Sequence, residues 1–132
     1  MDPRHHYADG SHNEAILSNG GSGFLVRGNR LDSNLEDGTS SALSFYGDFE
    51  QVRDALVERN LFNGGGFCVY AGSVDGKPYP VAANTRFVDN HFGRDLTDQC
   101  GWYGPVTAYR AGNGNAWSGN VWHDTGAVVP AP

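Results

Sequence analysis

The sequence predicts an all-β fold, a short right-handed parallel β-helix of about four coils with terminal caps. Asparagines recur at gaps of 31, 30 and 30 residues, at Asn29, Asn60, Asn90 and Asn120, and apolar residues precede and follow each one. A fixed period of this kind indicates a repeat architecture. Nineteen glycines and six prolines in 132 residues also disfavour long helices.

The elements of each predicted coil follow one order: strand, loop, strand, asparagine turn, short strand and loop. Short β-prone runs mark the first strand of each coil, at Ala15–Ser18, Ala42–Phe45, Cys68–Ala71 and Val106–Tyr109. The charges of Phe49–Arg59 would suit a helix, but Ala55–Val57 is needed as the second strand, so we expect a strand there. Three short strands per coil are typical of a β-helix.

The four asparagines have a structural interpretation. Asparagine tolerates the left-handed backbone conformation, and its amide can bond backbone groups. When such residues stack once per coil, their amides can also bond one another. We therefore expect Asn29, Asn60, Asn90 and Asn120 to form a ladder that holds the coils together rather than a ligand site.

Domain organisation follows from the extent of the repeats. Residues 12–126 are predicted to form the β-helix, residues 1–11 an N-terminal cap or arm, and residues 127–132 a C-terminal cap or tail. Covers are expected because open sheet edges invite pairing with other chains. If such caps are inadequate, the alternative is association with other chains, for instance as a homotrimer. Trp117 and Trp122 are expected to close the bottom of the core.

Composition and charge exclude several classes of function. The net charge is −6 and Lys77 is the only lysine, so no basic stripe predicts nucleic-acid binding. No stretch approaches the roughly 20 apolar residues of a membrane span. Met1 is not followed by a basic and then apolar leader, so we expect no signal peptide in this chain. A virion component released by lysis would need none, and we expect a virion or extracellular location.

The two cysteines, Cys68 and Cys100, lie in adjacent predicted coils. A disulfide from coil to coil is one interpretation, and two small buried hydrophobic residues are the other. Neither a C-x-x-C motif nor a Cys/His set with zinc spacing occurs, so no metal site is predicted.

Several strings in residues 12–126 resemble the right-handed parallel β-helix proteins of the pectate-lyase-like superfamily. The likeness is closer to those of actinobacteria and to the β-helix minor tail proteins of their phages. The resemblance implies the fold and not an activity. The strings are Ala42–Phe49, Val57–Tyr70, Asn90–Arg94, Tyr103–Val106 and Trp117–Trp122.

Many such relatives carry a His-x-Asp-Gly-(Ile/Val)-Gln string near a presumed glycan groove. The matching stretch here keeps His12 but has Glu14, Ala15 and Leu17 at the Asp, Gly and Gln positions. His12 and Glu14 belong to an N-terminal polar cluster with His5, His6 and Asp9. Such a cluster could bind a metal or move a proton, and a solvated end segment is the alternative.

The resemblance also implies an enzymatic alternative, a secreted polysaccharide lyase or hydrolase. Lyases of this fold typically need acidic residues for calcium and a Lys or Arg base near the sugar, so calcium is the cofactor expected in that case and none otherwise. The enzymatic alternative requires clustered carboxylates on one exposed face. The candidate residues are Asp48, Asp75, Lys77, Arg94, Asp95 and Asp98.

Aromatic residues at the first strand of each coil point to glycan contact, because sugar rings stack on Tyr and Trp. We expect Tyr46, Trp102 and Tyr103, with Asp48, to contact carbohydrate. Phe45, Tyr70 and Tyr109 are expected in one register, either all inside the coil or all outside it. The favoured function is a non-catalytic, glycan-facing binding or structural module of a phage tail or spike that contacts the host surface. A part of a larger secreted protein is a third interpretation.

Overall fold

The chain forms three parallel four-stranded sheets in a computed structural model, which describes residues 13–33 and 39–132. Sheet A contains β1 (Asn13–Ser18), β4 (Thr39–Phe45), β7 (Phe67–Ala71) and β10 (Gly104–Thr107). Sheet B contains β2 (Gly21–Arg27), β5 (Val52–Glu58), β8 (Ala83–Val88) and β11 (Ala116–Ser118). Sheet C contains β3 (Arg30–Ser33), β6 (Leu61–Gly64), β9 (His91–Phe92) and β12 (Val121–Trp122).

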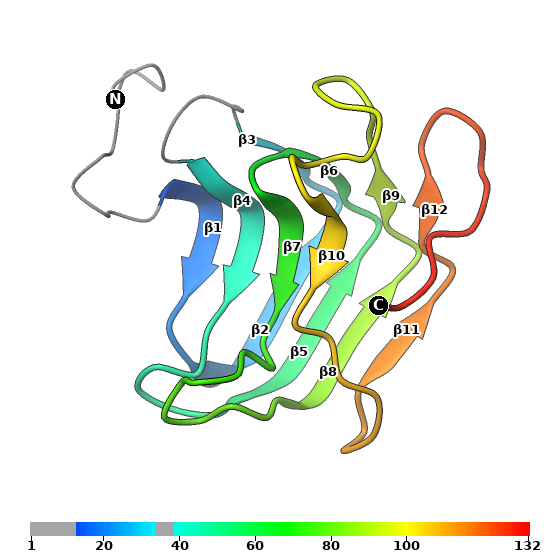
Figure 1. Ribbon diagram of the computed structural model, residues 1–132. Coiled ribbons are helices and arrows are strands. Elements are labelled where there is room, and N and C mark those ends of the chain that lie inside the picture. Colours follow the sequence, from blue (N-terminus) through cyan, green and yellow to red (C-terminus); the bar gives the residue numbers. More distant parts are fainter. Residues whose placement is uncertain (1–12, 34–38) are drawn as a thin grey trace.

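Every third strand returns to the same sheet, so the fold is a parallel β-solenoid, as the sequence predicts. In Figure 1 the chain descends through β1, rises behind it through β2, and returns to the front at β4, which makes the coil right-handed. Phe49–Arg59, whose charges would suit a helix, contains strand β5, as expected. The described residues contain no helix, and hence none long and apolar enough to cross a membrane.

The core is a column of side chains from successive coils. Phe62 and Phe92 occupy paired positions in β6 and β9, and their ring centroids lie 5.4 Å apart. Phe45 of sheet A contacts Phe87 of sheet B across the interior, at 6.4 Å. All four rings are almost fully buried. Such stacking follows from the fold, because the same position recurs once per coil.

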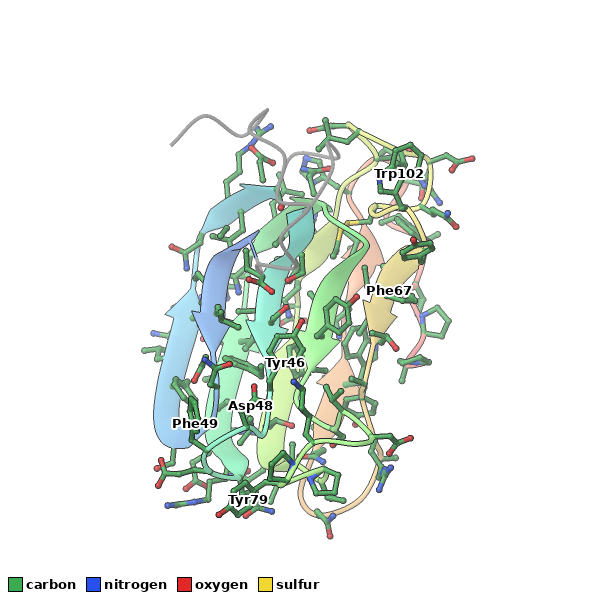
Figure 2. All side chains as sticks on the ribbon, turned by 60° about the vertical axis from the view of Figure 1, so that its left-hand side comes forward. Tyr46, Asp48, Phe49, Phe67, Tyr79 and Trp102 are labelled. Atoms are coloured by element: carbon green, nitrogen blue, oxygen red, sulfur yellow. A yellow bond between two sulfur atoms is a disulfide. The ribbon has the colours of Figure 1, made fainter. Side chains whose placement is uncertain are left out.

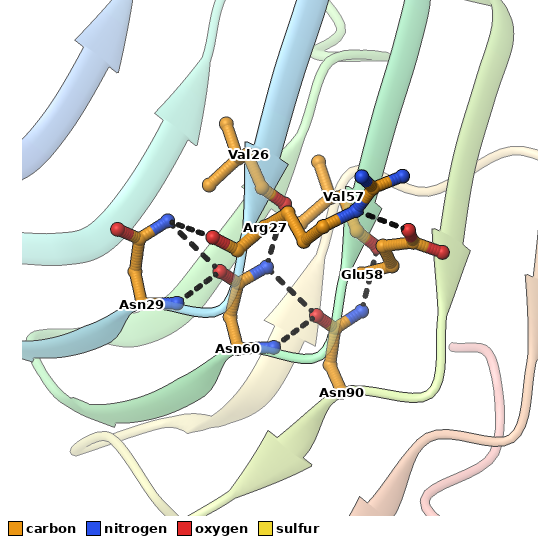
Figure 3. Close-up of polar contacts among 7 residues, drawn as sticks. All are labelled: Val26, Arg27, Asn29, Val57, Glu58, Asn60 and Asn90. Atoms are coloured by element: carbon orange, nitrogen blue, oxygen red, sulfur yellow. Dashed lines mark hydrogen bonds and ion pairs between the residues drawn. The ribbon is translucent and has the colours of Figure 1, made fainter.

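The asparagine ladder runs from coil to coil along the corner between sheets B and C, as Figure 3 shows for its first three members. The side-chain amide of Asn29 donates to the Oδ1 atom of Asn60 at 3.1 Å, and Asn60 donates to Asn90 at 3.0 Å. Asn90 donates to Asn120 at 2.9 Å. Each Oδ1 atom also accepts the backbone N–H of the preceding asparagine. The predicted ladder is therefore present over all four coils.

The backbone turn itself differs from the prediction. The left-handed residue is the one before each asparagine, at Gly28, Arg59, Asp89 and Gly119, with φ of 70°, 56°, 56° and 68°. Asn60, Asn90 and Asn120 instead have buried side chains. The exposed preceding residue turns the chain from sheet B into sheet C, and the asparagine that follows directs its amide into the ladder.

A disulfide joins Cys68 of β7 to Cys100 in the loop before β10, with the Cα atoms 6.0 Å apart. Both residues are fully buried. The carbonyl of Cys100 also accepts the N–H of Gly64 at 2.9 Å. The bridge therefore fixes the long β9–β10 loop against the corner between sheets C and A.

The C-terminal segment covers the last coil. The amides of Leu61, His91 and Val121 bond to the carbonyls of the asparagines one coil earlier, and the N–H of Val129 takes the same position at Asn120, at 2.8 Å. Val129 is buried, and its carbonyl accepts the indole N–H of Trp117. Val129 thus imitates the first residue of a further sheet C strand. The predicted N-terminal cap, residues 1–11, lies outside the described residues.

The predicted register of Phe45, Tyr70 and Tyr109 is wrong. Phe45 pairs with Ala71, and Tyr70 pairs with Ser44 and Thr107. Phe45 is therefore in the core, whereas Tyr70 and Tyr109 are only partly buried. The loops before the first strands differ in length, which shifts the alignment by one or two residues.

Candidate functional site

Four aromatic side chains form a continuous row along the outer side of sheet A; we call Tyr46, Tyr70, Phe67 and Tyr103 the aromatic row. Their successive ring centroids are 5.7, 5.7 and 5.8 Å apart. Tyr46 directly follows β4, Phe67 and Tyr70 belong to β7, and Tyr103 directly precedes β10. Figure 2 shows Tyr46 and Phe67 on this side of the molecule. The row therefore runs across three successive coils.

Exposure increases along the row. Tyr46 is 6% exposed, Phe67 and Tyr70 are intermediate, and Tyr103 is 73% exposed. The backbone under the exposed end is fixed, because the N–H of Tyr103 donates to the Gly66 carbonyl at 2.8 Å. A ring on a rigid support loses little conformational entropy when a ligand stacks on it.

The buried end of the row has an unusual electrostatic environment. Burial raises the pKa of the Tyr46 phenol far above its ordinary value, and the negative charge of Glu14 raises it further. Burial also raises the pKa of Tyr70, again with Glu14 contributing. Both carboxylate oxygens of Glu14 are buried. Glu14 of β1, predicted as part of a polar cluster, is therefore brought next to the tyrosines.

Lys77 closes the buried end of the row. Its ammonium nitrogen lies 5.0 Å from the centroid of the Tyr46 ring and 2.9 Å from a carboxylate oxygen of Asp48. A cation over an aromatic face is attracted by the ring quadrupole. Asp48, expected to contact carbohydrate, is thus engaged in an ion pair beside Tyr46.

A pocket of about 300 Å³ adjoins the row at Tyr70. An ion pair lies at its edge, with Nη2 of Arg110 3.0 Å from a carboxylate oxygen of Asp75. The pocket therefore combines two phenol rings with several hydrogen-bonding groups. The lining residues are Tyr70, Ser73, Val74, Asp75, Thr107, Ala108, Tyr109 and Arg110.

Trp102 lies beyond the exposed end of the row. Its side chain is 57% exposed, and its backbone N–H donates to the Gly65 carbonyl at 2.9 Å. Figure 2 places it above Phe67, at the far end from Tyr46. Of the expected contact residues, Tyr46 and Tyr103 belong to the row, Trp102 extends it, and Asp48 lies beside its buried end.

Three of the four acidic residues considered for catalysis occupy separate ion pairs. Asp48 pairs with Lys77, Asp75 with Arg110, and Asp95 with Arg30 at 3.3 Å. The carbonyl of Asp98 accepts from Arg94. Within residues 13–33 and 39–132, no group of three or more His, Cys, Asp or Glu side chains could hold a metal ion. His5, His6, Asp9 and His12 lie outside the described residues.

Sequence reasoning missed a second site, at strands β9 and β12 of sheet C. His91 and His123 lie at the rim of a pocket of about 460 Å³. Their Nδ1 atoms are 2.9 Å apart. Their separation of 32 residues, about one coil, is the signal that could have found them. Phe67 and Tyr70 were missed as partners of Tyr46 because the register of sheet A could not be fixed.

No protein-family model, characterised protein or solved structure matches this chain. The fold is therefore established by the structure alone.

Proposed function

We propose that this protein is a non-catalytic, glycan-facing binding or structural module, and that the aromatic row contacts the glycan. The observation that supports this proposal is the continuity of the row, from buried Tyr46 to exposed Tyr103. The apolar C–H faces of sugar rings stack on aromatic surfaces, and tyrosine tolerates partial exposure.

The adjoining pocket supplies the polar half of such a surface. Ser73, Thr107 and the ion pair between Arg110 and Asp75 line it. Sugar hydroxyls both donate and accept, so a carboxylate beside a guanidinium suits them. Ligand sites commonly combine apolar walls with a few polar groups that fix orientation.

A phage tail or spike component that contacts the host cell surface is the setting we propose. The resemblance of the repeats to β-helix minor tail proteins supports it. The disulfide between Cys68 and Cys100 suits a virion or extracellular location, because such bonds persist under oxidising conditions. The partners would be a cell-surface polysaccharide and, at the coil ends or flanks, further copies in a homotrimer or other virion proteins.

Binding to a panel of actinobacterial cell-wall and uronate-containing polysaccharides tests the proposal by isothermal titration calorimetry. Tyr103→Ala should weaken binding about tenfold, because it removes the exposed stacking surface. Trp102→Ala should weaken it by less. Leu25→Ala is the matched control, since Leu25 is 60% exposed on sheet B, away from the row. Absence of binding by the unaltered protein, or equal loss in the control, would overturn the proposal.

An enzymatic function is the second candidate, and the pairing of Asp75 with Arg110 at the edge of a sugar-sized pocket favours it. The reaction would be lysis or hydrolysis of a polysaccharide, with calcium as the cofactor proposed for a lyase. The test is an assay for new reducing or unsaturated sugar ends, with and without calcium. Product formation that disappears in Asp75→Asn would establish this candidate. No product across the panel would exclude it for those substrates.

A further inference from the structure

His91 and His123 are held side by side by the stacking of the last two coils. His91 begins β9, and its N–H donates to the carbonyl of Asn60 at 2.7 Å. His123 directly follows β12, and its N–H donates to the carbonyl of Phe92 at 2.9 Å. Both backbones are therefore fixed by inter-coil hydrogen bonds, and the positions of the two imidazoles depend on the solenoid rather than on a loop.

The two rings direct the same nitrogen at each other. The Nδ1 atoms are 2.9 Å apart and the ring centroids 5.1 Å apart. A hydrogen bond at this distance needs a proton on one Nδ1 atom and a lone pair on the other. Neutral imidazole nitrogens are also common ligands of transition metals.

We infer that His91 and His123 form a two-histidine site for a borderline divalent transition-metal ion, of the class Zn²⁺, Ni²⁺ or Cu²⁺. Metal–nitrogen bonds of about 2.0–2.1 Å at a tetrahedral angle require about 3.3 Å between the nitrogens. The observed separation must therefore open by only about 0.4 Å. The proton on Nδ1 moves through solvent to Nε2 of the same ring, so a neutral pair binds the ion without net loss of a proton.

The pocket beside the pair leaves room for the remaining ligands. Its volume of about 460 Å³ accommodates several waters, and Asp89 contributes a carboxylate to the lining. Arg30 and Arg59 line the same pocket. The charge of Arg30 is balanced by Asp32 at 2.9 Å and Asp95 at 3.3 Å, and the pocket lining contains one further residue of each sign, Arg59 and Asp89. The local charge therefore does not exclude a cation.

The chemistry of the ligands sets the selectivity. Two imidazole nitrogens favour borderline ions, whereas Ca²⁺ and Mg²⁺ require oxygen ligands. Because His91 and His123 belong to adjacent coils, the bound ion would link the third coil to the fourth. Binding to the folded state alone raises the melting temperature.

The test is calorimetric titration of the full chain with Zn²⁺, Ni²⁺, Cu²⁺, Ca²⁺ and Mg²⁺. We expect one site for a transition ion and none for Ca²⁺ or Mg²⁺. His91→Gln and His123→Gln should each weaken binding by at least about tenfold. The matched control replaces the other three of the five histidines, His5, His6 and His12, with glutamine and should bind like the unaltered protein. Circular dichroism of each variant monitors folding.

Three outcomes would overturn the inference: no transition-metal binding, binding that survives both single substitutions, or binding that is lost in the triple control. If the His91 and His123 variants do not fold, Cu²⁺ added to the unaltered protein decides. Selective paramagnetic broadening of the ring resonances of His91 and His123 supports the site, and its absence rejects it.

Discussion

A single buried side chain, Asn90, shows how much of the fold depends on individual residues. Its Oδ1 atom accepts from the backbone and the side chain of Asn60. Its amide nitrogen donates to the carbonyl of Val57 and to Asn120. All four bonds are buried, so no water can replace them.

Asn90→Ala should therefore lower the free energy of unfolding by about 3 kcal/mol or more, because it leaves several buried polar groups without partners. Asn29→Ala is the matched control at the exposed end of the ladder and should cost about 1 kcal/mol. Urea denaturation of both variants measures the difference. Equal losses would show that the ladder does not act through buried hydrogen bonds.

The buried phenol of Tyr46 makes stability depend on alkaline pH. Burial raises its pKa in the folded state, so the folded protein retains the proton where the unfolded chain loses it. The stability contribution is complete below the ordinary tyrosine pKa and is lost as pH rises from there towards the folded-state value. Tyr46→Phe should flatten this alkaline loss in thermal scans, and the exposed Tyr79→Phe should not. Identical alkaline profiles for Tyr46→Phe and the unaltered protein would contradict this.

At the scale of elements, the sequence predicts sheets B and C better than sheet A. The asparagine period of 31, 30 and 30 residues fixes where the second and third strands lie. In sheet A, Ile16 pairs with Leu43, Leu43 with Val69, and Val69 with Val106, at separations of 27, 26 and 37 residues. These separations differ because the loops between the strands have unequal lengths.

The candidate site lies on sheet A, and this explains why it was only partly predictable. Tyr46 and Tyr103 could be recognised as aromatic residues beside the first strands of their coils. The contacts of Tyr46 with Tyr70 and of Phe67 with Tyr103 depend on the register, which no local pattern specifies. The pair of His91 and His123 was equally hidden, because stacking rather than a short motif brings its members together.

The disulfide is the principal covalent constraint on the β9–β10 loop. Cys68 and Cys100 are 32 residues apart. For a closed loop of that length, the chain-entropy model gives about 3–4 kcal/mol of stabilisation. Cys68→Ser/Cys100→Ser should lose about this amount in urea denaturation, and the unaltered protein should lose it only when a reductant is added. A reductant effect in the double variant would point to another cause.

For the whole molecule, the C-terminal tail determines whether the last coil is closed. Val129 occupies the position that the next coil would take, and Val128 forms a bridge with Val121. Removal of residues 127–132 exposes the edge of β12, so we expect concentration-dependent association. Light scattering after size-exclusion chromatography measures it. Removal of residues 130–132 alone keeps Val129 and should leave the state of association unchanged.

The fold class was predictable because repetition averages out local ambiguity. A single run such as Ala55–Val57 is too short to distinguish strand from helix, but four runs at one period select the solenoid. The ends are not repeated, and the imitation of a further coil by Val129 has no signature beyond an apolar, proline-containing tail.

The ladder also has a direction. Each hydrogen bond between two asparagine side chains is donated by the earlier coil to the later one, and the backbone carbonyl of Asn120 already accepts the N–H of Val129. Head-to-tail stacking of copies would extend sheet C through the edge of β12, and the tail occupies that edge. A contact through the first coils of two copies would instead be isologous and would stop at a pair. The same six-residue tail that packs on the core therefore also covers the edge through which sheet C could be extended from one copy to the next.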